Sequence, residues 1–157
     1  MIPLKDDVPS SSFPFVTIGL IVLNALVFLY QASIGMGSER AAEAFIMEFG
    51  AVPCRVTGAC AVPGDFPSPI ATIFTSMFMH GGLFHIAGNM LYLWIFGDNV
   101  EDRLGHARFL VFYLLCGVFA GLAHIHFNPE STAPTVGSAE AGSSATCVSA
   151  AATPQAR

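Results

Sequence analysis

Charged side chains are scarce in this chain of 157 residues. Only 11% of the residues are Asp, Glu, Lys or Arg, whereas ordinary soluble domains carry about 25%. The net charge is −5, so the basic surface that binds nucleic acid is missing, and no nucleic acid is expected as a partner. The four cysteines show no C-x-x-C spacing, so neither a zinc knuckle nor a redox motif is indicated. The length limits the chain to one domain.

Long apolar runs take the place of charge, since 54% of the residues are hydrophobic. About 20 apolar residues form a helix that spans a bilayer. We therefore predict an all-α fold, a polytopic membrane helix bundle that contacts the lipid bilayer. Its membrane domain is expected to cover residues 1–128, with membrane helices at about 13–32, 82–97 and 107–127.

The first apolar run has a second interpretation, a signal peptide with Lys5 at its basic end. Asp6 and Asp7 weaken that interpretation, and no A-x-A cleavage motif follows. A retained membrane helix is the favoured hypothesis.

The segments between the helices are of two kinds. Residues 33–69 form a long connection in which only 41–49 has a helical, amphipathic pattern. Cys54 and Cys60 lie within it, and they either form a disulfide in an oxidising compartment or remain free thiols. Residues 97–105 are expected to form a polar turn.

The last two features concern packing and order. Gly117 and Gly121 are four positions apart in the third apolar run, a spacing that lets membrane helices approach closely. Residues 129–157 contain no aromatic side chain and are mostly Ala, Ser, Thr, Pro and Gly. Such a segment buries too little apolar surface to offset its ordering entropy, so we predict a disordered tail.

Positive charge predicts the orientation of the helices. Lys5 precedes the first helix, and Arg103 and Arg108 lie between the second and the third. Both positions belong on the cytoplasmic side by the positive-inside rule. We expect a multi-pass protein of the inner (cell) membrane with a cytoplasmic N-terminus, and connection 33–69 on the external side.

Two polar side chains in the second helix, His85 and Asn89, need an explanation. They are four positions apart, so they share one helical face. Polar groups at membrane depth are costly and usually face a protein interior or a wet cavity. Three interpretations fit: a structural hydrogen bond between helices, a metal site that uses several of the five histidines, or a pair of N–H donors for an oxyanion. The metal interpretation is disfavoured, because His80 falls off this face and His124 and His126 point to opposite sides of a helix.

Longer motifs around this pair resemble the rhomboid intramembrane serine proteases of the bacterial, six-helix type. The resemblance rests on TSMFMHGGLFHIAGNM at 75–90 and on FGDNVEDRLG at 96–105. GAVP at 50–53 and PTVG at 134–137 add to it. The similarity covers roughly residues 13–137, with the motifs in the family's order and spacing.

The resemblance implies roles for the matched positions. His85 and Asn89 match the oxyanion-stabilising residues of the second helix, and His80 matches a further histidine near its external end. Glu101 and Arg103 match the charged turn that pins the connection between helices 2 and 3. The implied reaction is hydrolysis of a peptide bond in or near a transmembrane segment of a membrane protein substrate, by a Ser/His dyad without metal or cofactor.

The chain departs from the family at the nucleophile. Rhomboids continue Pro-Thr-Val-Gly with Ala-Ser-Gly, whereas residues 137–142 read GSAEAG. Ser138 is then only a weak candidate nucleophile, and no match to the catalytic histidine of the sixth helix is found. A serine without a base is a poor nucleophile. We expect a sequence that is truncated or frameshifted after the third helix and inactive as written. The alternatives are a non-catalytic rhomboid-like binder of membrane helices and a fragment of a metal or solute transporter.

Overall fold

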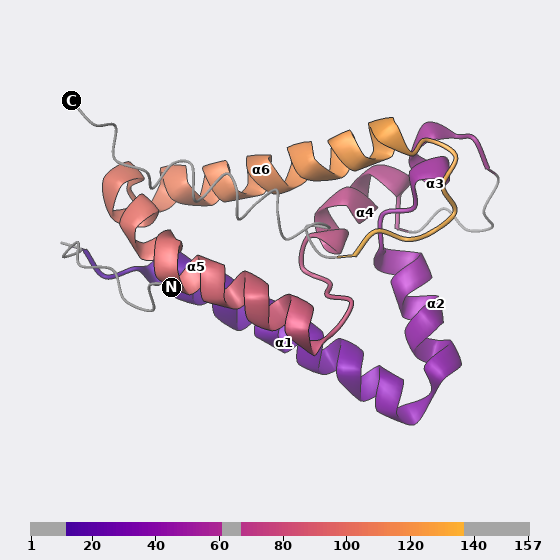
Figure 1. Ribbon diagram of the computed structural model, residues 1–157, viewed down its shortest axis with the longest axis horizontal. Coiled ribbons are helices and arrows are strands. Elements are labelled where there is room, and N and C mark those ends of the chain that lie inside the picture. Colours follow the sequence, from indigo (N-terminus) through magenta and orange to yellow (C-terminus); the bar gives the residue numbers. More distant parts are fainter. Residues whose placement is uncertain (1–11, 61–66, 137–157) are drawn as a thin grey trace.

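The computed structural model describes residues 12–60 and 67–136, and these residues form an assembly of helices (Figure 1). The predicted all-α class is confirmed. The helices are α1 (Phe15–Gly37), α2 (Glu39–Phe49), α3 (Pro53–Thr57), α4 (Pro69–Ser76), α5 (Leu83–Leu104) and α6 (His106–Phe127). In the described ranges, the only β interaction is an isolated antiparallel bridge between Ala51 and Thr135.

Helices α1 and α5 lie side by side along most of their length, and α6 leaves them at an angle (Figure 1). Close approach is possible because α5 has a glycine at the contact. A Cβ atom on Gly97 would lie 2.8 Å from Thr17 Cγ2 of α1. The three helices share a buried apolar cluster with the end of α4, formed by Leu20, Met77, Leu93, Val100, Phe109 and Tyr113.

The predicted turn at 97–105 is wrong, because α5 continues through these polar residues to Leu104. The chain reverses at Gly105 alone, whose φ of 80° lies in the left-handed region that glycine tolerates. The polar residues of this stretch suggested a loop. Their backbone continues the hydrogen bonding of α5, however, and polar side chains in the last turns of α5 bond to residues of other segments.

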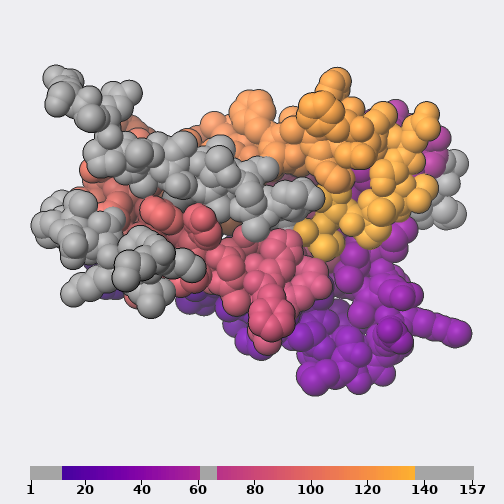
Figure 2. Space-filling view, viewed as in Figure 1, coloured from indigo at the N-terminus to yellow at the C-terminus, as the bar shows by residue number. Residues whose placement is uncertain are grey.

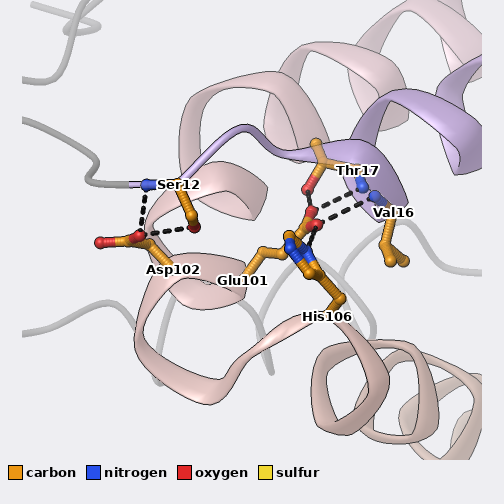
Figure 3. A network of polar contacts seen from close by, with 6 residues as sticks. All are labelled: Ser12, Val16, Thr17, Glu101, Asp102 and His106. Carbon is orange, nitrogen blue, oxygen red and sulfur yellow. Dashed lines mark hydrogen bonds and ion pairs between the residues drawn. The ribbon is translucent and has the colours of Figure 1, made fainter.

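Those partners are at the start of α1 (Figure 3). Pro14 precedes α1 and supplies no side-chain cap. Glu101 takes over this role, because its carboxylate accepts from Val16 N at 2.9 Å, Thr17 N at 2.7 Å and Thr17 Oγ1 at 2.7 Å. His106 Nδ1 is 2.5 Å from the same carboxylate. A negative charge at a helix N-terminus is stabilised by the free N–H groups and by the helix dipole.

The small-residue pair on α6 packs against α4, not against another long helix. A Cβ atom on Gly117 would overlap the end of the Met77 side chain, and one on Gly121 would lie 3.2 Å from Ile73 Cγ2. The spacing therefore predicted a close contact correctly. The spacing did not indicate which element packs there, and that element is the short helix α4.

Among the described residues, α1 and α6 are long and apolar enough to cross a membrane. Only 17% and 22% of their most apolar windows are buried, so their surfaces are largely apolar and outward-facing, unlike core helices of a soluble protein. Helix α5 has sufficient length, with 22 residues, but it contains the polar residues of the site and of the Glu101 network.

The connection 33–69 is more ordered than expected. Helix α1 extends to Gly37, five residues past its predicted end, and α2 begins at Glu39, two residues before the predicted 41–49. Helix α3 follows, and Cys54 and Cys60 are joined in a disulfide. The helix predicted from residue 82 begins at Leu83, directly after Gly81 and Gly82.

The first part of the predicted disordered tail is also ordered. Residues 129–136 run back along α3, and Ala51 and Thr135 exchange two backbone hydrogen bonds of 3.2 and 2.8 Å. Composition did not reveal this because the stabilising partners are 72 to 84 positions away in the sequence. The prediction for residues 137–157 lies outside the described residues.

Candidate active site

His85 and Asn89 lie on one face in the first two turns of α5. The helix begins where it does because Gly81 and Gly82 interrupt the apolar run, and Gly82 is the N-cap. His85 and Asn89 then follow one turn apart, as their spacing predicted.

Asn89 has an unused donor. Its Nδ2 atom is buried and has no hydrogen-bond acceptor within ranges 12–60 and 67–136. Leaving a buried donor unpaired costs about 1–3 kcal/mol, so such a group calls for an explanation. The other unpaired buried side-chain atom in those ranges is Asn24 Oδ1, which lies beside Tyr113 in the α1–α6 contact.

His85 borders a cavity of about 360 Å³. The opposite wall comes from the end of α6 and from the segment that follows it. The lining consists of His85, His124, Asn128, Ser131, Ala133, Pro134, Thr135 and Val136. The cavity can hold a small polar group beside the imidazole. The structure also places His124 on this wall, which nothing in its sequence spacing indicated.

Val136 and His85 both lie close to Gly81. A Cβ atom on Gly81 would lie 3.6 Å from Val136 Cγ2 and 3.8 Å from His85 Nδ1. The chain therefore approaches His85 immediately before the position where the family resemblance places the nucleophile motif. Ser138, the weak candidate, lies outside the described residues.

His80 lies beside His85, with ring centroids 5.4 Å apart. The sequence placed His80 off the face of His85, which holds for a continuous helix, but His80 is in the loop before α5. Gln31 of α1 fixes this loop, since its Nε2 donates to His80 O at 2.8 Å and its Oε1 accepts from His80 N at 3.4 Å.

Burial determines the charge of His80. Its side chain is inaccessible, and burial, together with neighbouring His85, lowers the pKa of His80 to about 4. His80 is therefore neutral at pH 7. Its Nδ1 atom is 3.2 Å from Phe78 O, and because a carbonyl oxygen only accepts, the proton of the ring is on Nδ1.

The two predicted supporting residues of the charged turn differ. Glu101 is completely buried in the network at the start of α1. The Arg103 side chain is exposed and makes no hydrogen bond or ion pair with any residue that the structure describes. Glu101 contacts α1 and His106 and does not contact His85. It therefore affects the site only by holding α5 against α1.

No metal centre is found in the part of the chain that is described: no three His, Cys, Asp or Glu side chains gather there in a suitable arrangement. The His85 imidazole borders the cavity, and the Asn89 carboxamide lies one turn away on the same helix face. N–H donors arranged in this way are suited to receive an oxygen atom that carries negative charge.

Comparison with known proteins gives one family. The family model described as "Rhomboid domain" matches residues 67–157, more than half of the chain. The chain is 37% identical over 65 residues to Rhomboid protease GluP of Bacillus subtilis (strain 168), covering 41% of this chain and 13% of that protein. It is 36% identical over 55 residues to Rhomboid protease GlpG of Salmonella newport (strain SL254), covering 35% of this chain and 20% of that protein. The chain therefore matches only a small part of each relative's length. No solved structure matches.

Proposed function

The chain belongs to the rhomboid family, and we propose that it carries the oxyanion-stabilising side of an intramembrane serine protease site. The observation that carries this proposal is the buried, unpaired Nδ2 of Asn89, one turn from His85 at the cavity. In peptide hydrolysis the carbonyl oxygen becomes negatively charged when a nucleophile attacks its carbon. Donors that are already oriented toward that oxygen lower the barrier without reorganising.

The reaction and substrate class follow from the family. The similar proteins GluP and GlpG are named rhomboid proteases. The proposed substrates are membrane proteins, cut in or near their transmembrane segments by a Ser/His dyad, without metal or cofactor. A site on α5 suits such substrates, because α5 packs beside α1 and α6, the two helices that are long and apolar enough to cross a membrane.

We propose that the polypeptide with the printed sequence does not cleave by itself. Residues 137–142 read GSAEAG, so Ser138 is not followed by glycine as in the family motif. A serine hydroxyl also requires a base to accept its proton. Within the described residues, the site presents donors but no assembled nucleophile and base.

The disulfide supports the proposed orientation in the inner membrane. Lys5, Arg103 and Arg108 favour a cytoplasmic location for the N-terminus and for the α5–α6 turn. Cys54 and Cys60 lie toward the other end of α6, since α3 packs against residues after Phe127. Disulfides persist in oxidising compartments, which supports the proposed external location of that end.

The second candidate function is a non-catalytic binder of membrane helices. The altered motif at 137–142 favours it, because a binder needs no nucleophile. Large apolar side chains of α5, including Phe84 and Trp94, are exposed and available to another helix in the bilayer.

A complementation experiment separates these functions. The chain is reconstituted in proteoliposomes, alone or with the serine- and histidine-bearing helices of Bacillus subtilis GluP supplied as a second polypeptide. We expect neither cleavage of a transmembrane substrate nor fluorophosphonate labelling with the chain alone, and cleavage with the mixture. Asn89→Ala or His85→Ala is expected to reduce that cleavage about 100-fold.

The control is Asn128→Ala, a carboxamide at the cavity that already donates to His124 O at 3.2 Å. It is expected to leave cleavage almost unchanged. Labelling of the chain alone, abolished by Ser138→Ala, would contradict the proposed inactivity. Full activity of Asn89→Ala in the mixture would contradict the oxyanion role, and stable capture of the substrate helix without cleavage would favour the binder.

A further inference from the structure

The disulfide closes a small loop at the end of α3. Cys54 is buried, Cys60 is partly exposed, and Cys60 N donates to Cys54 O at 3.2 Å. Between them, α3 ends at Gly58, whose φ of 74° is left-handed. The disulfide therefore holds together a short helix that has too few residues to be stable by its own hydrogen bonds.

This closed loop holds the segment that follows α6. Cys54 N donates to Ser131 O at 3.1 Å, and Thr57 Oγ1 donates to Pro129 O at 2.9 Å. The bridge between Ala51 and Thr135 extends the contact by four residues. Figure 2 shows the orange residues of this segment meeting the purple surface of the chain before and within α3.

The held segment is also the wall of the site cavity. Ser131 and residues 133–136 line it opposite His85. The segment has no regular helix or sheet of its own beyond the single bridge. It follows directly from the end of α6, where Ser131 N donates to Asn128 O, and its other backbone contacts are with α3 and with Ala51 just before α3. A change in α3 would therefore move the cavity wall while leaving α5 in place.

We propose that the Cys54–Cys60 disulfide is a redox-sensitive latch that holds segment 129–136 as the cavity wall opposite His85. Oxidised, the latch presents Cys54 N and Thr57 Oγ1 to the segment. Reduced, the α3 loop opens, and the segment separates from Ala51 and from the cavity. The latch is independent of whether the site cleaves peptides.

The reaction is thiol–disulfide exchange with a dithiol reductant. A thiolate of the dithiol attacks Sγ of Cys60, the less buried of the two residues, and the S–S bond breaks with Cys54 leaving as a thiolate that takes up a proton. The second thiol of the reductant then displaces Cys60 from the mixed disulfide. Two electrons reduce the protein disulfide to two thiols, and the dithiol becomes a disulfide.

Hydrogen exchange of the full chain in detergent micelles tests the latch, with dithiothreitol as the dithiol. The readouts are the Ala51 and Thr135 amides, which are bonded only to each other's carbonyls. On reduction we expect their exchange to accelerate about tenfold or more, because local opening becomes easier. The Val16 and Thr17 amides, bonded to Glu101, should exchange as before.

The double variant Cys54→Ser and Cys60→Ser should exchange like the reduced protein and should not respond to dithiothreitol. That lack of response excludes an effect through Cys116, the buried cysteine of α6 that lies outside the disulfide. Reduction of the folded wild type provides the same answer if the variant fails to fold. Unchanged exchange at Ala51 and Thr135 would overturn the latch. Equal acceleration at all four amides would overturn it as well, since the disulfide would then stabilise the whole bundle.

Discussion

The two ends of α5 differ in whether their buried polar side chains have hydrogen-bond partners. At the carboxyl end, the Glu101 carboxylate accepts hydrogen bonds from Val16 and Thr17 and contacts His106 (Figure 3). At the amino end, the buried Nδ2 of Asn89 has no acceptor among the described residues, and His85 borders a cavity. The same helix thus has a satisfied network at one end and an unsatisfied donor at the other.

This difference separates a structural role from a binding role. A polar group whose partners are all within the chain contributes to stability, and its loss leaves those partners unpaired. A buried donor without a partner lowers stability and calls for an explanation, and the proposed oxyanion role of Asn89 supplies one. The comparison predicts that substitutions at the Glu101 end alter mainly stability, whereas substitutions at the Asn89 end alter mainly binding.

The largest effect is expected for Glu101→Ala. Glu101 is completely buried, and its loss leaves the Val16 and Thr17 N–H groups without acceptors at a helix start. We expect destabilisation of about 3 kcal/mol or more, measured by thermal unfolding in detergent micelles. Arg103→Ala, which removes an exposed charge from the same turn, is the control and should have little effect. Equal stability of both variants would contradict the structural role of Glu101.

Glycine substitutions test the same contrast in packing. In Gly97→Ala the new Cβ atom would meet Thr17 Cγ2 at 2.8 Å, so we expect a loss of about 1–3 kcal/mol. Gly88→Ala on the same helix meets nothing within 4 Å. Since alanine is the better helix former, this control should be neutral or up to about 1 kcal/mol more stable. If Gly97→Ala melts like the wild type, α1 and α5 do not approach as described.

Acid provides a test of the loop beside His85. The pKa of His80 is lowered to about 4 in the folded protein, whereas the unfolded chain takes up a proton near pH 6.5. Between these values the unfolded state binds more protons, so stability falls as the pH falls from about 6.5 to about 4. The loss by pH 4 is expected to be of order 1–3 kcal/mol. Melting curves of the wild type and His80→Gln should diverge in this window, and parallel curves would show that His80 is not buried as a neutral group.

The smallest effect on stability is expected for Asn89→Leu. Its Nδ2 makes no hydrogen bond within the described residues, so its replacement removes an unpaired buried donor. The free energy of unfolding should equal that of the wild type or exceed it by up to about 1 kcal/mol. The matched comparison is Thr17→Val, which removes a hydroxyl bonded to Glu101 at 2.7 Å and should cost about 1–3 kcal/mol. A larger loss for Asn89→Leu than for Thr17→Val would reverse the roles of the two ends.

Local sequence signals predicted the helices well and their polar ends poorly. The helix predicted from residue 82 begins at Leu83, and Ser38 caps α2 close to its predicted start. The polar stretch 97–105 was misread because the hydrogen-bond partners of Glu101 are 84 and 85 residues earlier in the chain. A window of neighbouring residues contains no information about such partners.

The candidate site shows the same division. The spacing of His85 and Asn89 was sufficient to place both side chains on one face, because helix geometry is local. His124 and residues 133–136 were missed as cavity-lining residues, since they reach His85 only through the position of α3 and its disulfide.

By itself, the sequence determined the membrane-helix character, the shared face of His85 and Asn89, and the departure from the family motif at 137–142. These follow from hydropathy, helical periodicity and residue identity, which are all read over a few neighbouring positions. Only the tertiary structure decided that Glu101 caps α1, that α4 packs against Gly117 and Gly121, and that residues of segment 129–136 line the cavity. Each of these depends on residues far apart in the chain, which only packing and hydrogen bonding between separate helices bring together.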